Sequence, residues 1–590
     1  MRRLFGRFGG YCVALLTLIV RTYAEPETLI ASIGPGGDEN QLGAVLAELG
    51  NQTSRMQGDL VIELLDGTYY LEQPLGFFPS CSGANGHFVV LRAAKDAKPV
   101  LSRGERVRGW KRRQNGTWYT SVRSQTVRQL FVNNVRGQRA RGRFPIGAEP
   151  FGDLRVLDKP AGFIMPDETM ARWGSPSDIE IGFFNSWSHM TCRVSWIYCG
   201  VDGRAHISMS APTFMLVSRK EGARAETPAY VENAFELLDE PGEWYSGSMS
   251  NTLFYMPCDG EDMTTATVVI TDDNRLLSFR AQEKSAPHHI RFEGITFAEA
   301  AGERALSGHA DVQANFAIAS ENLYERNGFL VNVHNEYRKP DAAIVIEAAH
   351  DLVFDSCTFT RIAGAALNVE AAKDAFDVAA HDIIVRNCDF HDIGGSAIQI
   401  GGVGRYAHHP INDDQVVRNI RVENCKIHHV GVEFEGSVGI FAGYTQGTVI
   451  EGNEIYNLPY SGISIGWGWG EEDAGGSTYP IPFIYETPTP ARDNRIANNH
   501  IHHVMQKRLD GGGVYTLGNQ PGTVIENNHI HDNPGWPGGI YLDEGSGFIE
   551  VRGNRVYDVP TPMNFNNRNQ GRIDTCNVHD NDFGPPKQQE

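Results

Sequence analysis

One short phrase recurs through the second half of the chain. It reads apolar residue, two variable residues, Cys or Asn, one variable residue, and then Ile, Val or Phe. The copies are Phe354–Phe359, Val385–Phe390, Val422–Ile427, Ile450–Ile455, Ile496–Ile501, Ile525–Ile530, Val551–Val556 and Val578–Phe583. An earlier copy, Phe292–Phe297, has Ile295 in place of the Cys or Asn. The regular steps are 31, 37, 28, 29, 26 and 27 residues, and steps of 46 and 62 residues carry insertions or an extra coil. Steps of this length with short strands and no helical period indicate a solenoid. Several short strands per coil make it a parallel β-helix, an all-β fold.

The Cys or Asn of the phrase should stack from coil to coil. This position is Cys357, Cys388 and Cys425 in three coils, and then Asn453, Asn499, Asn528, Asn554 and Asn581. Neighbouring coils lie about 4.8 Å apart, so that identical side chains touch and Asn amides can form a hydrogen-bonded ladder. We therefore expect these cysteines to be buried and structural.

The histidines follow the same repeat. His391, His428, His502 and His531 all come directly after the second apolar residue of the phrase, where other coils carry Tyr456 or Tyr557. Since the repeat explains this spacing, we expect no metal, no cofactor and no loss of stability with a chelator.

The chain divides into four parts. Residues 1–24 have a basic start, an apolar run over 11–20 and small residues before a cleavage point after Ala24, which predicts a signal peptide and a secreted or periplasmic protein. An uncleaved membrane anchor is the alternative. Residues 25–104 hold an N-terminal cap and the first coils, 105–285 lose the repeat and predict an inserted β-rich module, and 286–590 form the main β-helix.

The net charge limits the kinds of molecule that this protein can bind. The chain has 52 Lys and Arg against 72 Asp and Glu, a net charge of −20. Such a surface disfavours binding to nucleic acid or to an anionic membrane. We expect a monomer, in which Cys192 and Cys199 are close enough in sequence to pair in an oxidising compartment.

Several phrases outside the repeat carry a family resemblance. They are Asp66-Gly-Thr-Tyr-Tyr, Arg128-Gln-Leu-Phe-Val-Asn with Arg139-Ala-Arg, the run from Glu232 to Trp244, Ile290–Phe297, the run from Asp510 to Gly518, and Tyr541-Leu-Asp-Glu-Gly. With them the chain resembles secreted right-handed parallel β-helix proteins close to glycoside hydrolase family 141, from Asp66 to about Asn554. The resemblance implies hydrolysis of plant-type glycans, including α-L-fucoside and xylan cleavage. The opening at residues 33–40 departs from the family pattern, and this difference concerns the first coil rather than the site.

The filled interior of a β-helix requires a binding site on its outer face. A second strand in each coil alternates so that Val514 and Ile540 point inward while Tyr515 and Tyr541 point outward. With Trp467 and Trp469, these tyrosines predict a row of exposed aromatic rings on which sugars could stack. The alternative is that the insertion at 457–495 covers them.

Carboxylates flank this aromatic row. Asp510 precedes one strand and Asp543 follows the next, so a glycosidase could use them as acid/base and nucleophile, with Glu544 as a substrate contact. Arg508, beside Lys507, could bind hydroxyls or an acidic sugar. The alternative for both aspartates is that they only cap turns.

Three functions remain open from sequence. The first is a glycoside hydrolase acting on a plant- or algal-type polysaccharide or oligosaccharide. The second is a polysaccharide lyase or epimerase on uronic acids, which would need a basic or calcium-assisted site near Arg508. The third is a non-catalytic glycan-binding surface protein, which would lack a pair of carboxylates facing one groove.

Overall fold

The structure is a computed structural model, and it describes residues 27–35, 41–53, 55–123, 127–153, 159–222, 224–271, 275–282, 285–300, 308–374, 377–476, 483–566 and 572–585. The expected signal segment, residues 1–24, lies outside these ranges. Among the described helices, none combines the length and apolar character needed to cross a bilayer.

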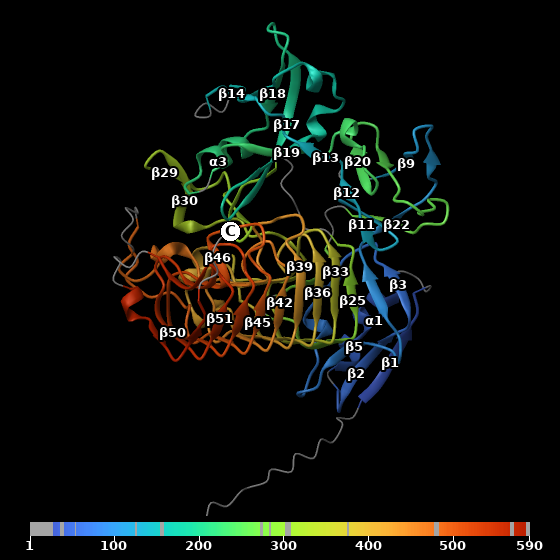
Figure 1. Cartoon of the computed structure of the whole chain (residues 1–590). Helices are drawn as coiled ribbons and strands as arrows, with labels where there is room; N and C mark the ends of the chain where they lie inside the picture. The colour runs from blue at the N-terminus through green and yellow to red at the C-terminus, as the bar shows by residue number, and fades with distance from the viewer. Residues whose placement is uncertain are drawn as a thin grey trace, which may run out of the picture.

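Three long parallel sheets form the solenoid body (Figure 1). Sheet A consists of β1 (Glu27–Ile33), β2 (Asp59–Leu64), β5 (Val89–Ala93), β24 (His288–Glu293), β32 (His350–Asp355), β35 (His381–Arg386), β38 (Arg418–Glu423), β41 (Val449–Glu451), β44 (Arg495–Ala497), β47 (Asn519–Glu526), β50 (Gly547–Arg552) and β53 (Asn577–His579). Sheet B consists of β3 (Gly67–Tyr70), β6 (Pro99–Ser102), β25 (Thr296–Ala298), β33 (Thr358–Ile362), β36 (Asp389–Ile393), β39 (Lys426–Val430), β42 (Glu454–Tyr456), β45 (His500–His502), β48 (His529–His531), β51 (Arg555–Tyr557) and β54 (Asp582–Phe583). Sheet C consists of β4 (Leu75–Phe77), β23 (Leu277–Phe279), β31 (Ala342–Ile346), β34 (Ala365–Val369), β37 (Ile398–Ile400), β40 (Ile440–Ala442), β43 (Ile463–Ile465), β46 (Gly511–Thr516), β49 (Pro537–Leu542) and β52 (Thr561–Phe565). The parallel β-helix expected from the repeat is confirmed.

The repeat phrase supplies one strand to sheet A and one to sheet B in each coil. In the coil of β41 and β42, Ile450 and Ile455 are fully buried, and Asn453 at the corner between them is 1% exposed. Helix α1 (Gln41–Glu48) adds Leu42 and Leu46 to the same apolar core, so it covers the first coil, next to the short α2 (Gly50–Thr53). A further short helix, α4 (Arg405–His408), follows β37.

The corner residues form the expected ladder. The side-chain amide of each Asn donates to the side-chain oxygen of the next, with 2.9 Å between nitrogen and oxygen from Asn453 to Asn499, Asn499 to Asn528, Asn528 to Asn554 and Asn554 to Asn581. The Cys388 thiol contacts both Cys357 and Cys425, so the stacking of the three cysteines is confirmed. Burial and the contact with Cys357 raise the pKa of Cys388 well above its usual value, against the opposing contact with Cys425, which keeps Cys388 a neutral thiol.

Removing one member of the Asn ladder should destabilise the protein. In Asn528→Ala, the backbone N–H and side-chain amide of Asn499 lose their acceptor, and the carbonyl of Ile496 loses a donor. We expect the free energy of unfolding to fall by at least about 2 kcal/mol, because several buried polar groups are left unpaired. Denaturant unfolding measures the loss, and Asn577→Ala, at an exposed strand position, is the matched control. Equal effects of the two changes would contradict the ladder's role.

An antiparallel module lies over one side of the solenoid, above sheet C in Figure 1. Its elements are β7 (Glu105–Val107), β8 (Lys111–Arg112), β9 (Trp118–Ser121), β10 (Gln129–Val132), β11 (Val135–Arg136), β12 (Gln138–Arg139), β13 (Arg141–Arg143), β14 (Glu149–Phe151), β15 (Gly162–Ile164), β16 (Glu180–Phe184), β17 (His189–Cys199), β18 (Ala205–Met209), α3 (Thr213–Arg219), β19 (Pro228–Glu232), β20 (Glu243–Gly247), β21 (Thr252–Tyr255) and β22 (Val268–Thr271). It has its own apolar core, which includes Ile181, Phe183 and Met190. The parallel sheets resume at β23, so the sequence-based boundary at residue 285 falls after the first returning strand.

A disulfide between Cys192 and Cys199 is excluded by this module. Both residues lie on the single strand β17, seven positions apart. Seven residues of extended strand span roughly 23 Å, far beyond the separation of about 7 Å that a disulfide can bridge. Closeness in sequence misled the prediction because the segment between them is a strand and not a turn.

Non-repeating segments leave the solenoid at both edges of sheet C. The module and the segment 299–341 both lie between a strand of sheet B and the next strand of sheet C, and the segment 466–494 follows β43 of sheet C. The segment 299–341 contains β26 (Gly308–His309), β27 (Asp311–Gln313), β28 (Phe316–Ala317), β29 (Leu323–Arg326) and β30 (Phe329–Asn332), and β26 pairs with β17 of the module. The long steps of 62 and 46 residues are therefore insertions within a coil. The module, the segment 299–341 and the segment 466–494 thus form three walls around the outer face of sheet C.

Candidate active site

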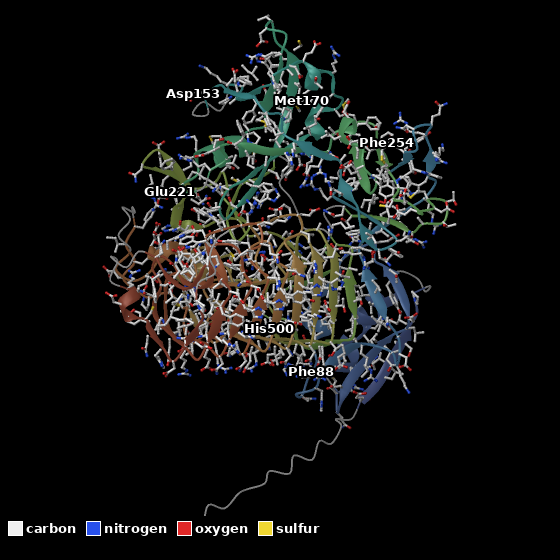
Figure 2. All side chains as sticks on the ribbon, in the orientation of Figure 1. Phe88, Asp153, Met170, Glu221, Phe254 and His500 are labelled. Carbon is white, nitrogen blue, oxygen red and sulfur yellow. The ribbon has the colours of Figure 1, made fainter. Side chains whose placement is uncertain are left out.

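A cavity of about 290 Å³ opens where these walls meet sheet C. The module contributes residues near the end of α3, and Figure 2 labels one of them, Glu221, on the part of the module that approaches the solenoid. The cavity is lined by Trp187, Glu221, Gly222, Val312, Gln313, Arg326, Asn335, Tyr337, Trp469, Glu471, Asp510, Tyr515, Asp543, Glu544 and Asn566. Asp510, Asp543 and Glu544, singled out from sequence, thus line the same cavity.

Asp510 enters the cavity just before strand β46. Its backbone is left-handed, with φ of 62°, which Asp tolerates better than most residues, and its N–H donates to the carbonyl of Trp536 at 2.6 Å. The Tyr541 hydroxyl donates to Asp510 Oδ1 at 3.2 Å. The glycines that follow allow close packing of coils: a Cβ on Gly512 would lie 2.4 Å from the carbonyl oxygen of Gly539. Asp510 therefore lines the cavity, and its carboxyl group accepts a hydrogen bond from the side chain of Tyr541.

Asp543 follows strand β49 in the next coil and is 7% exposed. Tyr515 donates its hydroxyl to Asp543 Oδ2 at 2.5 Å, and Asn566 donates its amide to Oδ1 at 2.7 Å. The Tyr541 hydroxyl also lies within hydrogen-bonding reach of Asp543, so it stands between the two carboxyl groups. Two donors on separate oxygens favour the ionised carboxylate.

Burial, charge repulsion and hydrogen bonds give the carboxyl groups of Asp510 and Asp543 different pKa values. Burial, reinforced by the charge of Asp543, raises the pKa of Asp510 to about 6, against the opposing hydrogen bond from Tyr541. Burial also raises the pKa of Asp543, but the hydrogen bonds from Tyr515 and Asn566 oppose this rise. The pair can therefore hold one proton near neutrality, with Asp510 as the better proton carrier.

The prediction of an exposed aromatic row is wrong. Trp467, Tyr515 and Tyr541 are 1%, 2% and 1% exposed, because the three walls cover the face toward which their strands direct them. Trp467 packs against Phe441 and donates its indole N–H to the carbonyl of Asn335 at 3.3 Å. Only Trp469 of the four is partly exposed, and it lines the cavity.

Arg508 does not line the cavity. Its guanidinium donates to the carbonyl of Asn185 at 2.8 Å, pairs with Glu435 at 3.2 Å and lies over the ring of Phe184 at 4.5 Å. Neighbouring Lys507 also pairs with Glu435, at 2.7 Å. Arg508 therefore ties the solenoid to the module, whereas Lys507 forms its ion pair within the solenoid, and neither cation lines the cavity in which a contact with substrate was expected.

A buried ionic group in the cavity wall was missed from sequence. Arg326, 9% exposed, donates to Glu471 at 2.7 Å and to Glu221 at 2.9 Å, while the Asn335 amide donates to Glu471 at 2.9 Å. Burial raises the pKa of Glu471 in spite of the arginine. The only signal in the sequence was the acidic run Glu471-Glu472-Asp473; Arg326 lies where the repeat is interrupted, so nothing indicated its partners.

Comparison with known proteins supports the β-helix architecture and matches nearly the whole chain to the structure of an enzyme. A family model described as right handed beta helix region matches residues 411–585. The chain is a right-handed parallel β-helix protein. A solved structure described as a glycoside hydrolase is 26% identical, with a TM-score of 0.76, and the match covers 94% of this chain and 96% of that one. No curated protein matches the sequence.

Weaker likenesses exist to other β-helix structures. XylC in complex with xylose is 12% identical, with a TM-score of 0.45 and coverage of 91% of this chain and 70% of that one. The A-module of the mannuronan C-5 epimerase AlgE6 of Azotobacter vinelandii is 13% identical, with a TM-score of 0.27 and coverage of 54% and 70%.

Proposed function

We propose that this protein is a glycoside hydrolase whose reaction takes place in the cavity at Asp510 and Asp543. The observation that carries the proposal is that two carboxyl groups from adjacent coils line one cavity and have different hydrogen-bond environments. Glycosidases need such a pair, one group to donate a proton and the other to act as base or nucleophile. The similarity over nearly the whole length to a glycoside hydrolase supports the same activity.

In this mechanism Asp510 is the general acid. Its raised pKa keeps a proton available for the leaving glycosidic oxygen. Asp543, held by Tyr515 and Asn566, is the ionised group, which either attacks the anomeric carbon or takes a proton from the attacking water. Tyr541, which reaches both carboxyl groups, positions them relative to each other.

We further propose that the substrate is the end of a plant- or algal-type glycan, of the fucoside or xylan kind. The resemblance to glycoside hydrolase family 141 supports this class. A cavity of about 290 Å³ lies at the small end of ligand sites, roughly 300–1,000 Å³, and favours one or a few sugar units over a long stretch of polymer. Gln313, Asn335 and Glu221 supply polar groups for sugar hydroxyls, and Trp469 supplies an aromatic face.

The uronate lyase or epimerase alternative loses its main support. A basic site for this alternative relied on the positive charge of Lys507 and Arg508, which pair with Glu435 away from the cavity. The cavity's own arginine, Arg326, is paired with two glutamates. The non-catalytic alternative required the absence of a facing carboxylate pair, whereas both aspartates line the cavity.

A substrate screen tests the proposal. Purified protein is incubated with a panel of aryl glycosides and plant and algal polysaccharides, and both reducing ends and ultraviolet absorbance of unsaturated products are followed. Hydrolysis raises reducing ends without absorbance. Absorbance with a uronic acid polymer would favour the lyase, and binding without turnover across the panel would favour a glycan-binding protein.

The pH dependence of hydrolysis should show which aspartate is the acid. Because Asp510 must be protonated, kcat/KM should fall as the pH rises through about 6, and because Asp543 must be ionised, it should also fall toward acid pH. The profile is measured on the best substrate of the screen. A rate that stays level as the pH rises well past 6 would contradict Asp510 as the acid.

A further inference from the structure

Two histidines on sheet B are not explained by the repeat. In register along this face, the second outward position reads His391, His428, Tyr456, His502, His531 and Tyr557, a continuous stack of rings. The first outward position reads Asp389, Lys426, Glu454, His500, His529 and Arg555. The ring stack accounts for His502 and His531. His500 and His529, however, stand where the neighbouring coils carry charged side chains.

The local sequence places four imidazoles on one patch. Strands β45 and β48 both read His-Ile-His, and the buried Ile501 and Ile530 direct both histidines of each strand outward. His500 pairs in register with His529, and the two rings stack with centroids 4.9 Å apart. Figure 2 labels His500 on the solenoid body, away from the module, so this patch is distinct from the cavity on sheet C.

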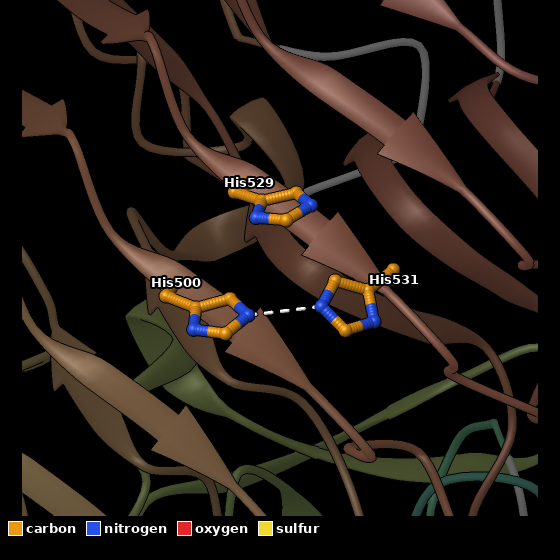
Figure 3. A group of neighbouring side chains, drawn as sticks. All are labelled: His500, His529 and His531. Atoms are coloured by element: carbon orange, nitrogen blue, oxygen red, sulfur yellow. Dashed lines mark hydrogen bonds between the residues drawn. The ribbon is translucent and has the colours of Figure 1, made fainter.

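We propose that His500, His529 and His531 bind a divalent transition-metal ion of the kind that prefers imidazole, such as Zn²⁺. One ring nitrogen from each of the three lies within 4.8 Å of the others, and Nε2 of His500 is 2.9 Å from Nε2 of His531 (Figure 3). Ligands of a tetrahedral Zn²⁺ lie roughly 3.3 Å apart at metal–nitrogen distances of about 2.0 Å, so small side-chain rotations suffice. Three histidines leave the fourth position to water.

The surroundings of these rings resemble those of metal ligands. Nδ1 of His531 lies 2.7 Å from Oδ2 of Asp532, a contact that places the ring proton on Nδ1 and leaves Nε2 free to bind a metal. The adjacent His502 has a buried Nε2 with no hydrogen-bond partner within the described ranges. Glu454, on the next strand, forms a second group with His500 and His502 and supplies negative charge beside the patch.

Binding of an ion at these rings would also connect two coils of the solenoid. An ion would replace the hydrogen now shared by His500 and His531, and it would tie the coils of β45 and β48 together. This proposal differs from the expectation drawn from sequence, in which the repeat alone accounted for the histidines.

Zinc titration of the full chain without a polyhistidine tag tests the proposal. After removal of metals with a chelator, calorimetry with ZnCl₂ should show about one tight equivalent, and Zn²⁺ should raise the melting temperature. The double variant His500→Gln/His529→Gln should bind at least about tenfold more weakly and lose the thermal shift. His428→Gln, in the same ring stack but in a different group, is the matched control and should behave as the parent.

Two outcomes would overturn the metal site. One is parent-like Zn²⁺ binding by the double variant; the other is loss of binding in His428→Gln alone. As a test on the unaltered protein, Co²⁺ should give the visible absorption of a four-coordinate site with three nitrogen ligands and one water, and its absence would also count against the proposal. None of these readouts depends on hydrolase activity.

Discussion

We expect Asp510→Asn and Asp543→Asn each to lower kcat/KM by about 10²- to 10⁴-fold, since each change removes a carboxyl group that transfers a proton or contacts the reacting carbon. Asparagine keeps the shape of both side chains, but at Asp543 its NH2 group replaces an oxygen that accepts from Tyr515 or Asn566, so the folded state of each variant is checked by circular dichroism. Asp493→Asn, in which the native side chain is 61% exposed, is the matched control and should keep full activity. If either active-site variant keeps full activity while folded, that residue has no catalytic role, and Glu544 becomes the next candidate.

Substrates with different leaving groups should distinguish the general acid, Asp510, from the base or nucleophile, Asp543. A general acid matters most when the departing oxygen is basic, so Asp510→Asn should lose much less activity on an aryl glycoside with an acidic phenol than on a natural glycan. Asp543→Asn should lose activity on both, because its carboxylate acts on the anomeric carbon or on water. Equal losses for the two variants across a series of aryl leaving groups would argue against this assignment.

Replacing Arg326 should have the largest effect on stability. In Arg326→Met, Glu471 remains 4% exposed beside Glu472, which is 3% exposed, and no other ion pair of either glutamate is found among the residues that the structure describes. Breaking a buried ion pair in this way costs about 3–5 kcal/mol of unfolding free energy. Denaturant unfolding at neutral pH measures it, and Arg338→Met, at an exposed position on the same segment, is the control.

The pH dependence of this variant gives an independent check. Burial already raises the pKa of Glu471, and loss of the arginine raises it further. A carboxyl group with a raised pKa in the folded state favours folding at low pH and opposes it as the pH rises through that value. The loss of unfolding free energy in Arg326→Met should therefore become smaller at lower pH. Adding Glu471→Gln to Arg326→Met should recover part of the lost stability. A deficit that is independent of pH, with no recovery in the double variant, would point to lost packing instead.

The solenoid was predictable because its information is local and repeated. Each copy of the phrase places two apolar side chains inward and one Cys or Asn at a corner, and the neighbouring coil offers the same groups about 4.8 Å away. The ladder from Asn453 to Asn581 follows from this spacing alone. The same regularity located Asp510 and Asp543 beside the strands of adjacent coils, although the strand alignment could not tell whether both would meet one cavity.

The walls of the cavity were not predictable in this way. The module, the segment 299–341 and the segment 466–494 have no period, so nothing in their sequence states what they pack against. Outward alternation correctly placed Tyr515 and Tyr541 on the outer face of sheet C, but exposure depends on what covers that face. The covering segments bury these two rings and Trp467. They also place Arg326 and Glu221 in the lining of the cavity.

The sequence by itself thus determined the coil, its core and its corner ladder, because these depend on contacts between identical positions in neighbouring repeats. Only the tertiary structure decided which outer face became a cavity, that Arg508 holds the module instead of meeting the cavity, and that a ring nitrogen of His500 turns toward one of His531. Those features arise where segments far apart in the chain, or two outward positions of adjacent coils, meet in space. Their contacts are set by the packing of the whole molecule, which no single stretch of residues encodes.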